Sequence, residues 1–161
     1  MKKKGKLTHV DEQGAARMVD VSAKPETLRT ASARGSIRMN SDALEAIRSH
    51  SLAKGDVLSV AKLAGIMAAK KTADLVPLCH PLLLDDVQVE LDLDPKLPGV
   101  VAQSKVRTTG RTGVEMEAIV AVTVALVTVY DMAKSLDRSM VIGDISLVDK
   151  TGGRSGTYHN H

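Results

Sequence analysis

"VQVELDLDPKLPGVVAQSKVRTT", residues 87–109, alternates apolar and polar side chains on both sides of a turn that contains proline and glycine. The alternation is strict over residues 87–93, which is typical of a strand with one buried face. Residues 100–108 predict a second strand, and residues 95–99 predict the turn between the two. The stretch therefore predicts a β-hairpin, around which the rest of the fold can be placed.

Helices are predicted on both sides of this hairpin. Upstream, Ser41 and Asp42 begin one helix, with Asp42 and Glu45 in the spacing of a capping box. A second helix begins after Asp56, the predicted N-cap, and repeats apolar residues at spacings of three and four. Downstream, an apolar segment from Gly113 to residue 136 continues for more than twenty residues without a breaker. That length favours a helix over a strand, despite its many valines.

Two further strands complete the expected order. Residues 26–39 alternate loosely and predict a first strand, and residues 145–148 predict a last one. The order of strand, two helices, hairpin, helix and strand predicts an α+β, ferredoxin-like fold. Its antiparallel sheet is expected to carry the helices on one face. We expect a single domain over residues 1–161, with flexible termini at about residues 1–17 and 151–161.

The composition excludes several classes of protein. The chain of 161 residues is 43% hydrophobic, yet its only aromatic residues are Tyr130 and Tyr158. Binding modules for single-stranded nucleic acids need stacking platforms, which this chain lacks, and a net charge of +3 does not require a nucleic-acid partner. The apolar run 118–130 is shorter than the roughly 20 residues of a membrane span. The single cysteine, Cys79, fits a reducing, cytoplasmic environment.

The long predicted helix carries charged residues at both ends. Glu117 and Asp131 lie about 21 Å apart along its axis at 1.5 Å per residue, so one small-molecule site in one chain cannot easily use both. Asp131 is unfavourable near the negative end of the helix dipole, and we interpret it as functional. Lys134 can pair with Asp131 at i,i+3, or can simply complement the dipole. Glu115 stands three residues after Thr112, so it is either a capping residue or a site residue.

A proline-bracketed segment and a glycine-containing loop are further candidates. Pro77 and Pro81 enclose Leu78, Cys79 and His80, which holds a histidine rigidly beside the only cysteine. The chain has no second cysteine and no metal-ligand spacing, so we predict no metal site and no cofactor. Adjacent side chains on an extended segment point apart, which argues against a Cys–His nucleophile pair. Residues 109–113, TGRTG, stand where a strand meets a helix and can favour an anion.

Basic residues are frequent in the predicted loops and at helix ends. If they face one cleft, they indicate a site for a phosphate-rich ligand; taken singly, each is a solvated charge. The candidates are Lys24, Arg29, Lys54, Lys70, Lys71, Lys150 and Arg154.

Taken together, these segments resemble the MoaC family of molybdenum cofactor biosynthesis. The resemblance rests on KGDV at 54–57, AAKKTADLVPLCHPL at 68–82, TGRTGVEMEA at 109–118, YDMAK at 130–134 and KTGGRSG at 150–156. It covers about residues 7–157.

The resemblance implies a lyase. This enzyme converts 3′,8-cyclo-7,8-dihydroguanosine 5′-triphosphate to cyclic pyranopterin monophosphate and releases pyrophosphate. It also implies a ferredoxin-like hexamer, a trimer of dimers, with active sites between subunits. By similarity, the catalytic residues are Asp131, Lys54 and Lys134, and the substrate-lining residues are Leu78, Cys79, His80, Met116, Glu117 and Glu115. Lys24, Arg29, Lys70 and Lys150 are added as candidate ligands of the triphosphate.

A second hypothesis is a non-catalytic ferredoxin-like module that binds nucleotides or RNA through its basic loops. The scarcity of aromatic residues argues against RNA, and this hypothesis leaves Asp131 unexplained. The expected partners are therefore a nucleotide-derived triphosphate and further copies of the same chain, with no nucleic acid and no membrane.

Overall fold

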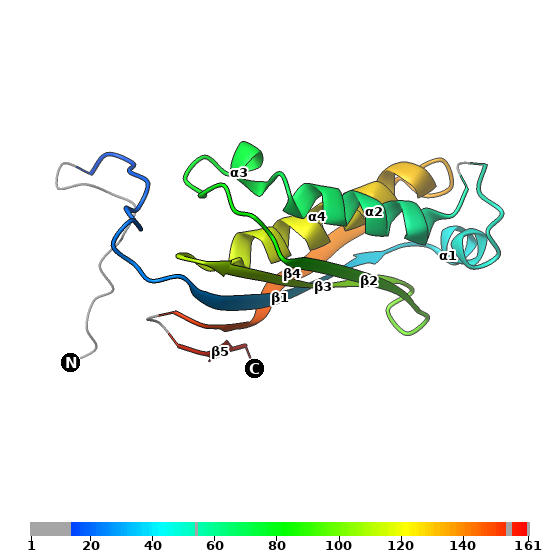
Figure 1. Ribbon diagram of the computed structural model, residues 1–161. Coiled ribbons are helices and arrows are strands. Elements are labelled where there is room, and N and C mark those ends of the chain that lie inside the picture. Colours follow the sequence, from blue (N-terminus) through cyan, green and yellow to red (C-terminus); the bar gives the residue numbers. More distant parts are fainter. Residues whose placement is uncertain (1–13, 54, 154–155, 161) are drawn as a thin grey trace.

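The structure, a computed structural model, describes residues 14–53, 55–153 and 156–160. It has two layers, one a β-sheet and the other a set of helices. The elements in chain order are β1 (Thr27–Arg38), α1 (Ser41–Arg48), α2 (Val57–Ala69), α3 (Thr72–Leu75), β2 (Asp86–Asp94), β3 (Gly99–Gly110), α4 (Glu115–Ala133), β4 (Val141–Thr151) and β5 (Tyr158–His159). The helices α2 and α4 lie along the same face of the sheet (Figure 1).

The sheet confirms the predicted hairpin and the predicted class. Its strand order is β2-β3-β1-β4-β5, and every neighbouring pair is antiparallel. The hairpin strands β2 and β3 pair from Asp86 with Arg107 to Asp94 with Gly99. β1 is inserted between β3 and β4, as the order of a ferredoxin-like βαββαβ chain requires. The fold is therefore α+β, with an antiparallel sheet covered by helices on one face.

The helix starts correct one predicted cap and decide against the capping alternative for Glu115. The N-cap of α1 is Asn40, whose side chain accepts a hydrogen bond from the Ala43 N–H at 2.8 Å, so the capping box of Asp42 and Glu45 was wrong. No side chain caps the first turn of α4, since Glu115 is turned toward Lys150. The cap of α2 is confirmed, because Asp56 accepts from the Ser59 N–H at 3.1 Å.

One strand is much longer than predicted, and two short elements were not predicted. β4 extends over Val141–Thr151, well beyond the predicted residues 145–148. The short helix α3 (Thr72–Leu75) and the short strand β5 (Tyr158–His159) were not predicted. Short elements have little periodicity of their own, and β5 depends on pairing with β4 at Asp149 and Lys150.

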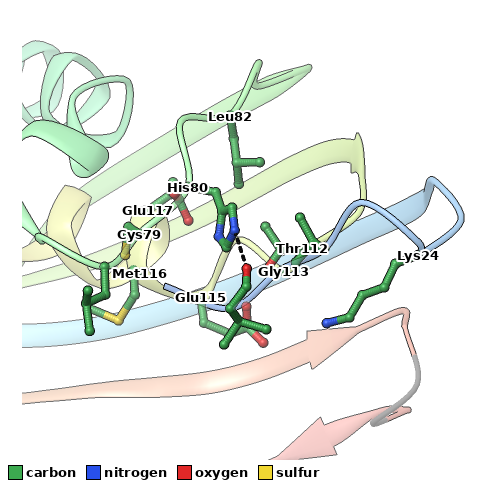
Figure 2. A pocket seen from close by; sticks show the side chains of 12 residues that line it. Lys24, Cys79, His80, Leu82, Thr112, Gly113, Glu115, Met116 and Glu117 are labelled. Carbon is green, nitrogen blue, oxygen red and sulfur yellow. Dashed lines mark hydrogen bonds between the residues drawn. The ribbon is translucent and has the colours of Figure 1, made fainter. Parts of the chain in front are cut away.

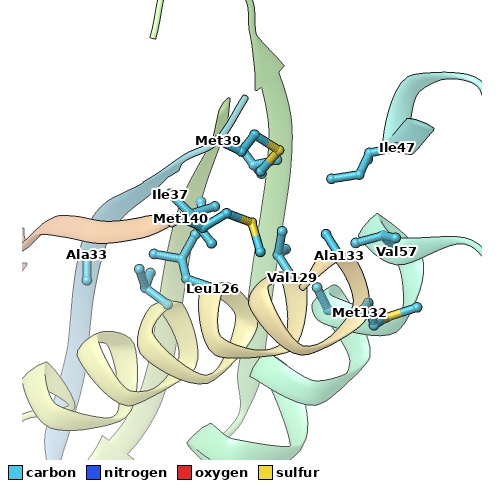
Figure 3. Packing of buried hydrophobic residues seen from close by; sticks show 14 of the residues in the cluster. Ala33, Ile37, Met39, Ile47, Val57, Leu126, Val129, Met132, Ala133 and Met140 are labelled. Carbon is cyan, nitrogen blue, oxygen red and sulfur yellow. The ribbon is translucent and has the colours of Figure 1, made fainter. Parts of the chain in front are cut away.

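The core is aliphatic, as the composition requires. Leu126 and Val129 of α4 are completely buried, and so is Ile37 of β1. Figure 3 shows Leu126 and Val129 on the side of α4 that faces the strands, with Ile37 and Met140 above them. With no Phe or Trp to fill space, valine, alanine, leucine and methionine side chains provide the packing.

α4 has 19 residues and is apolar enough to cross a membrane by length and composition. It is thus longer than the run 118–130 considered in the sequence. Half of its apolar stretch is buried inside the fold, where the helix packs against α2, β1 and β3. Because α4 is buried on several sides, its apolar composition is that of a core helix.

α2 and α4 approach each other closely at Gly65. A Cβ atom at this position would lie 2.8 Å from the Ala121 carbonyl oxygen and 3.3 Å from the Ala125 Cβ. Gly65 and the two alanines are buried. The small residues therefore set the distance between the two helices.

We predict that Gly65→Ala destabilises the protein, because its methyl group would force α2 away from α4. The free energy of unfolding should fall by about 1–3 kcal/mol, even though alanine is favoured over glycine within a helix by ~1 kcal/mol. Urea unfolding at one fixed protein concentration measures the change.

The matched control is Gly143→Ala in β4, where a Cβ atom would meet nothing within 4 Å. This variant should unfold at the wild-type midpoint or slightly above it. Equal midpoints for Gly65→Ala and the wild type would show that the helices are not held at the distance described.

Candidate functional site

The proline-bracketed segment 77–81 lies against the start of α4. Leu78, Cys79 and His80 line a cavity of about 430 Å³, and Met116 and Glu117 of α4 line it from the other side. Figure 2 shows Cys79, His80, Met116 and Glu117 around this space. The structure thus brings together all six residues that the resemblance assigned to substrate lining, since Glu115 also lines this cavity.

Glu117 is the buried acid of this cavity. The residue is only 4% exposed. Burial raises the pKa of its carboxyl group from 4.5 to about 7, and the charge of Glu115 contributes to the same shift. Burial also raises the pKa of the Cys79 thiol, and the neighbouring Glu117 adds to this shift. Both shifts are toward the neutral form, and the thiol is not an activated nucleophile.

His80 is held from the side of the N-terminal segment. Its Nε2 lies 2.8 Å from the carbonyl oxygen of Val19, and this hydrogen bond is drawn in Figure 2. Val19 and Val21 line the same cavity. Neither valine was predicted as a site residue, because short apolar residues before a strand carry no signal of a site.

A second, larger cavity of about 920 Å³ is lined by four cationic side chains, those of Lys24, Arg29, Arg111 and Lys150. Glu115 also lines it, and its Oε1 lies 3.3 Å from the Lys150 Nζ. Arg111 was not among the predicted ligands, although it stands at the centre of the loop that was expected to favour an anion. An excess of positive charge in a cavity of this size suits a polyphosphate.

The two cavities adjoin. Lys24, Thr112, Gly113 and Glu115 line both of them, so the loop that precedes α4 forms their shared rim. The cationic cavity and the cavity around Glu117 therefore form one continuous site with two different halves.

Arg29 is the buried cation of this site. It is 8% exposed, and its guanidinium donates to the carbonyl oxygens of Gly110 at 3.3 Å and Arg111 at 3.4 Å. Gly153, at a φ of +78°, passes so close that a Cβ atom there would overlap the guanidinium. The glycine-rich strand end is therefore shaped around Arg29.

Asp131 and Lys134 lie at the other end of α4. The predicted pairing is confirmed, since the Lys134 Nζ lies 2.7 Å from the Asp131 Oδ1. With Ser135 and Arg138 they line a separate cavity of about 400 Å³. The Tyr130 hydroxyl donates to the Arg138 carbonyl oxygen at 3.1 Å and so holds the loop beside this pair. One chain does not bring Asp131 to the cavity of Glu117.

Two predicted residues are not placed in any of these cavities. Lys54 lies outside the described residues. Lys70 is exposed at the C-cap of α2 and lines none of the three cavities. Within the ranges that the structure describes, no group of three or more His, Cys, Asp or Glu residues is arranged to hold a metal ion.

Comparison with known proteins gives one consistent result. The MoaC family model matches residues 18–153, which include both adjoining cavities. A relative from Heliobacterium modesticaldum is 58% identical over 152 residues, covering 94% of this chain and 96% of the relative. One from Parvibaculum lavamentivorans is 58% identical over 95% of this chain and 96% of its own length. One from Desulfitobacterium hafniense is 55% identical over 94% and 93% of the two chains.

All three relatives are named cyclic pyranopterin monophosphate synthase. The identity and the coverage leave no large part of the fold unmatched. The chain belongs to the MoaC family.

Proposed function

We propose that the adjoining cavities form the active site of a cyclic pyranopterin monophosphate synthase in molybdenum cofactor biosynthesis. The substrate would be 3′,8-cyclo-7,8-dihydroguanosine 5′-triphosphate, and the products cyclic pyranopterin monophosphate and pyrophosphate. The observation that carries this proposal is the two-part site, in which a cationic cavity and a cavity with a buried acid of raised pKa share one rim. Family membership and the names of the relatives support it.

The cationic half suits the triphosphate. Arg29 is fixed by two backbone carbonyl groups, while Lys24, Arg111 and Lys150 approach from the surrounding loops and β4. In the proposed reaction, a sugar hydroxyl gives its proton to one of the acid/base groups of the site and its oxygen forms a bond to the α-phosphorus. The bond from this phosphorus to the oxygen bridging to the β-phosphorus breaks. The cations stabilise the negative charge that the leaving pyrophosphate gains.

The other half suits the ring system derived from guanine. Apart from His80, the described side chains that line it include no ring, so the ligand cannot be stacked between aromatic groups. Leu78 and Met116 offer aliphatic surface instead. With a pKa of about 7, Glu117 retains a proton at neutral pH in a substantial part of the molecules and can donate a hydrogen bond to a ring carbonyl or nitrogen.

We assign the remaining proton transfers to Asp131, Lys134 and Lys54, with Asp131 and Lys134 contributed by a second subunit. The helix rise supports this, since Glu117 and Asp131 are about 21 Å apart along α4. An exposed apolar row on α2, formed by Val60, Leu63 and Met67, supports association of copies. Because the resemblance to the MoaC family implies it, we propose a hexamer built as a trimer of dimers, with Lys70 as a further ligand of the substrate. We place the protein in the cytoplasm, where Cys79 stays reduced.

We predict that the protein releases pyrophosphate from the cyclic GTP derivative, and that Gly153→Ala lowers kcat/KM by about tenfold or more. The new methyl group would displace the Arg29 guanidinium, and a hydrogen bond to a charged group contributes about 1.5–3 kcal/mol. A coupled assay for pyrophosphate measures both effects.

The matched control is Gly156→Ala. Gly156 also has a positive φ, of +66°, but a Cβ atom there meets nothing within 4 Å. Its kcat/KM should stay within about twofold to threefold of wild type, since both variants carry the backbone strain of ~1–2 kcal/mol and only one meets Arg29. A wild-type protein that releases no pyrophosphate, but binds RNA in a salt-sensitive manner, would contradict the proposed function.

We predict that inactive His80→Ala and Asp131→Ala proteins complement each other when their subunits are exchanged. If each site takes His80 from one chain and Asp131 from its partner, random pairing restores about a quarter of the sites. Pyrophosphate release after mixing, compared with the unmixed variants, measures the recovery.

The control mixture combines His80→Ala with Arg29→Ala. These two residues line adjoining cavities of one chain, so every mixed site keeps one of the two mutations and no activity should return. Proven exchange without recovery in the first mixture would contradict a shared site.

We predict that Glu117→Gln stabilises the protein in alkaline solution. Between pH 4.5 and about 7 the unfolded chain has ionised this group while the folded chain retains the proton, so wild-type stability falls as the pH rises through this window. Above about pH 7 the variant should be more stable by up to ~3 kcal/mol, and the difference should vanish below about pH 4.5. Urea unfolding across this pH range measures it.

Glu45→Gln is the control for a carboxylate that is exposed on α1. Its stability relative to wild type should change little over the same range. A Glu117→Gln protein whose stability follows the wild-type pH curve would show that this carboxyl is not held neutral by burial.

A further inference from the structure

The N-terminal segment 18–24, here called the strap, has a defined conformation over the cavity of His80. The Ser22 N–H donates to the Asp20 Oδ1 at 2.8 Å, and the Lys24 N–H donates to the Val21 carbonyl oxygen at 3.0 Å. These are the bonds of two tight turns. The strap therefore runs from Val19, which touches His80, to Lys24, which lines both cavities.

The contact between Val19 and His80 determines where the ring proton sits. The Val19 carbonyl oxygen lies 2.8 Å from the Nε2, and a carbonyl oxygen can only accept a hydrogen bond. The hydrogen must therefore be on Nε2. In a neutral imidazole the other nitrogen, Nδ1, then carries the lone pair.

The strap also brings a carboxylate into the electric field of the ring. The pKa of Asp20 is lowered, first by the hydrogen bonds from Ser22 and then by the charges of Arg17 and His80. Asp20 is thus close enough to His80 for their charges to interact. The strap supplies both an acceptor for Nε2–H and a counter-charge for the imidazolium form.

We propose that the strap is a positioning element that fixes His80 in its Nε2–H tautomer, so that Nδ1 exchanges a proton with the substrate. This deepens the proposed function and rests on it. In the step, an N–H or O–H bond of the substrate breaks, its electron pair stays on the substrate, and the proton bonds to Nδ1. The imidazolium keeps its Nε2–H on Val19, and return of the proton from Nδ1 restores the starting tautomer.

The first test is a direct measurement of the tautomer. Long-range ¹H–¹⁵N correlation spectra of the full-length protein with ¹⁵N-labelled histidine distinguish Nε2–H from Nδ1–H, and the His80 signals are those missing from a His80→Gln sample. At a pH where the ring is neutral, we expect the Nε2–H tautomer to predominate. A predominant Nδ1–H tautomer would overturn the proposal.

The second test uses two amide variants of the full chain. In His80→Gln the amide nitrogen can occupy the Nε2 position and donate to Val19, but no base remains at the Nδ1 position. In His80→Asn the side chain is too short to reach Val19. We expect amide hydrogen exchange over residues 20–24 to match wild type in the Gln variant and to be at least about tenfold faster in the Asn variant.

Pyrophosphate release should fall by about 100-fold or more in both variants, since neither amide can take up a proton. Equal exchange in the Asn variant and the wild type would overturn the role of the strap, and an active Gln variant would overturn the role of Nδ1. The tautomer of His80 and the amide exchange rates can both be measured without any enzymatic turnover. A wild type that releases no pyrophosphate therefore defeats the proposed function and its proton transfer, whereas an active wild type with the Nδ1–H tautomer defeats this inference alone.

Discussion

The burial of α4 between α2 and the sheet is the packing interaction on which the rest of the molecule depends. The close approach at Gly65 brings α2 down onto α4, and the valine and leucine side chains of α4 fill the space above β1 and β3. Because α4 is held along its length, its two ends are rigid platforms. One end presents Met116 and Glu117 to a cavity, and the other presents Asp131 and Lys134.

The same burial gives the two halves of the candidate site their different electrostatic character. Glu117 stands at the edge of the core, where desolvation favours its neutral form. Arg29 is nearly as buried, but a guanidinium stays charged in proteins. Among the described residues, the carbonyl groups of Gly110 and Arg111 accept its hydrogen bonds, and no carboxylate does. A buried acid of raised pKa thus stands on one side of the loop, and on the other stands a buried cation that no carboxylate of the described residues pairs with. That arrangement leaves the positive charge available to a ligand.

Much of the fold follows from local patterns in the sequence. Strict alternation identified the hairpin, and the length of the apolar segment identified α4 as a helix although its valines favour strands. The pairing of Asp131 with Lys134 was predictable because both lie within one turn of the same helix. The capping boxes failed because stronger partners were available. Asn40, two residues before Asp42, caps α1, and Lys150 attracts Glu115 across a distance of 35 residues in the sequence.

The remaining features depend on contacts that local patterns do not encode. The burial of Glu117, the contact of Val19 with His80, and the carbonyl groups that hold Arg29 all depend on segments far apart in the chain.

The scarcity of aromatic residues has a consequence for the optical spectra of the protein, which depend on two tyrosines. With no tryptophan, the near-ultraviolet absorption and emission of the chain arise from Tyr130, one residue from Asp131, and Tyr158, on the edge strand β5. Replacing Tyr158 would leave a single natural chromophore, hydrogen-bonded through its hydroxyl beside Asp131 and Lys134, as an optical reporter of that end of α4.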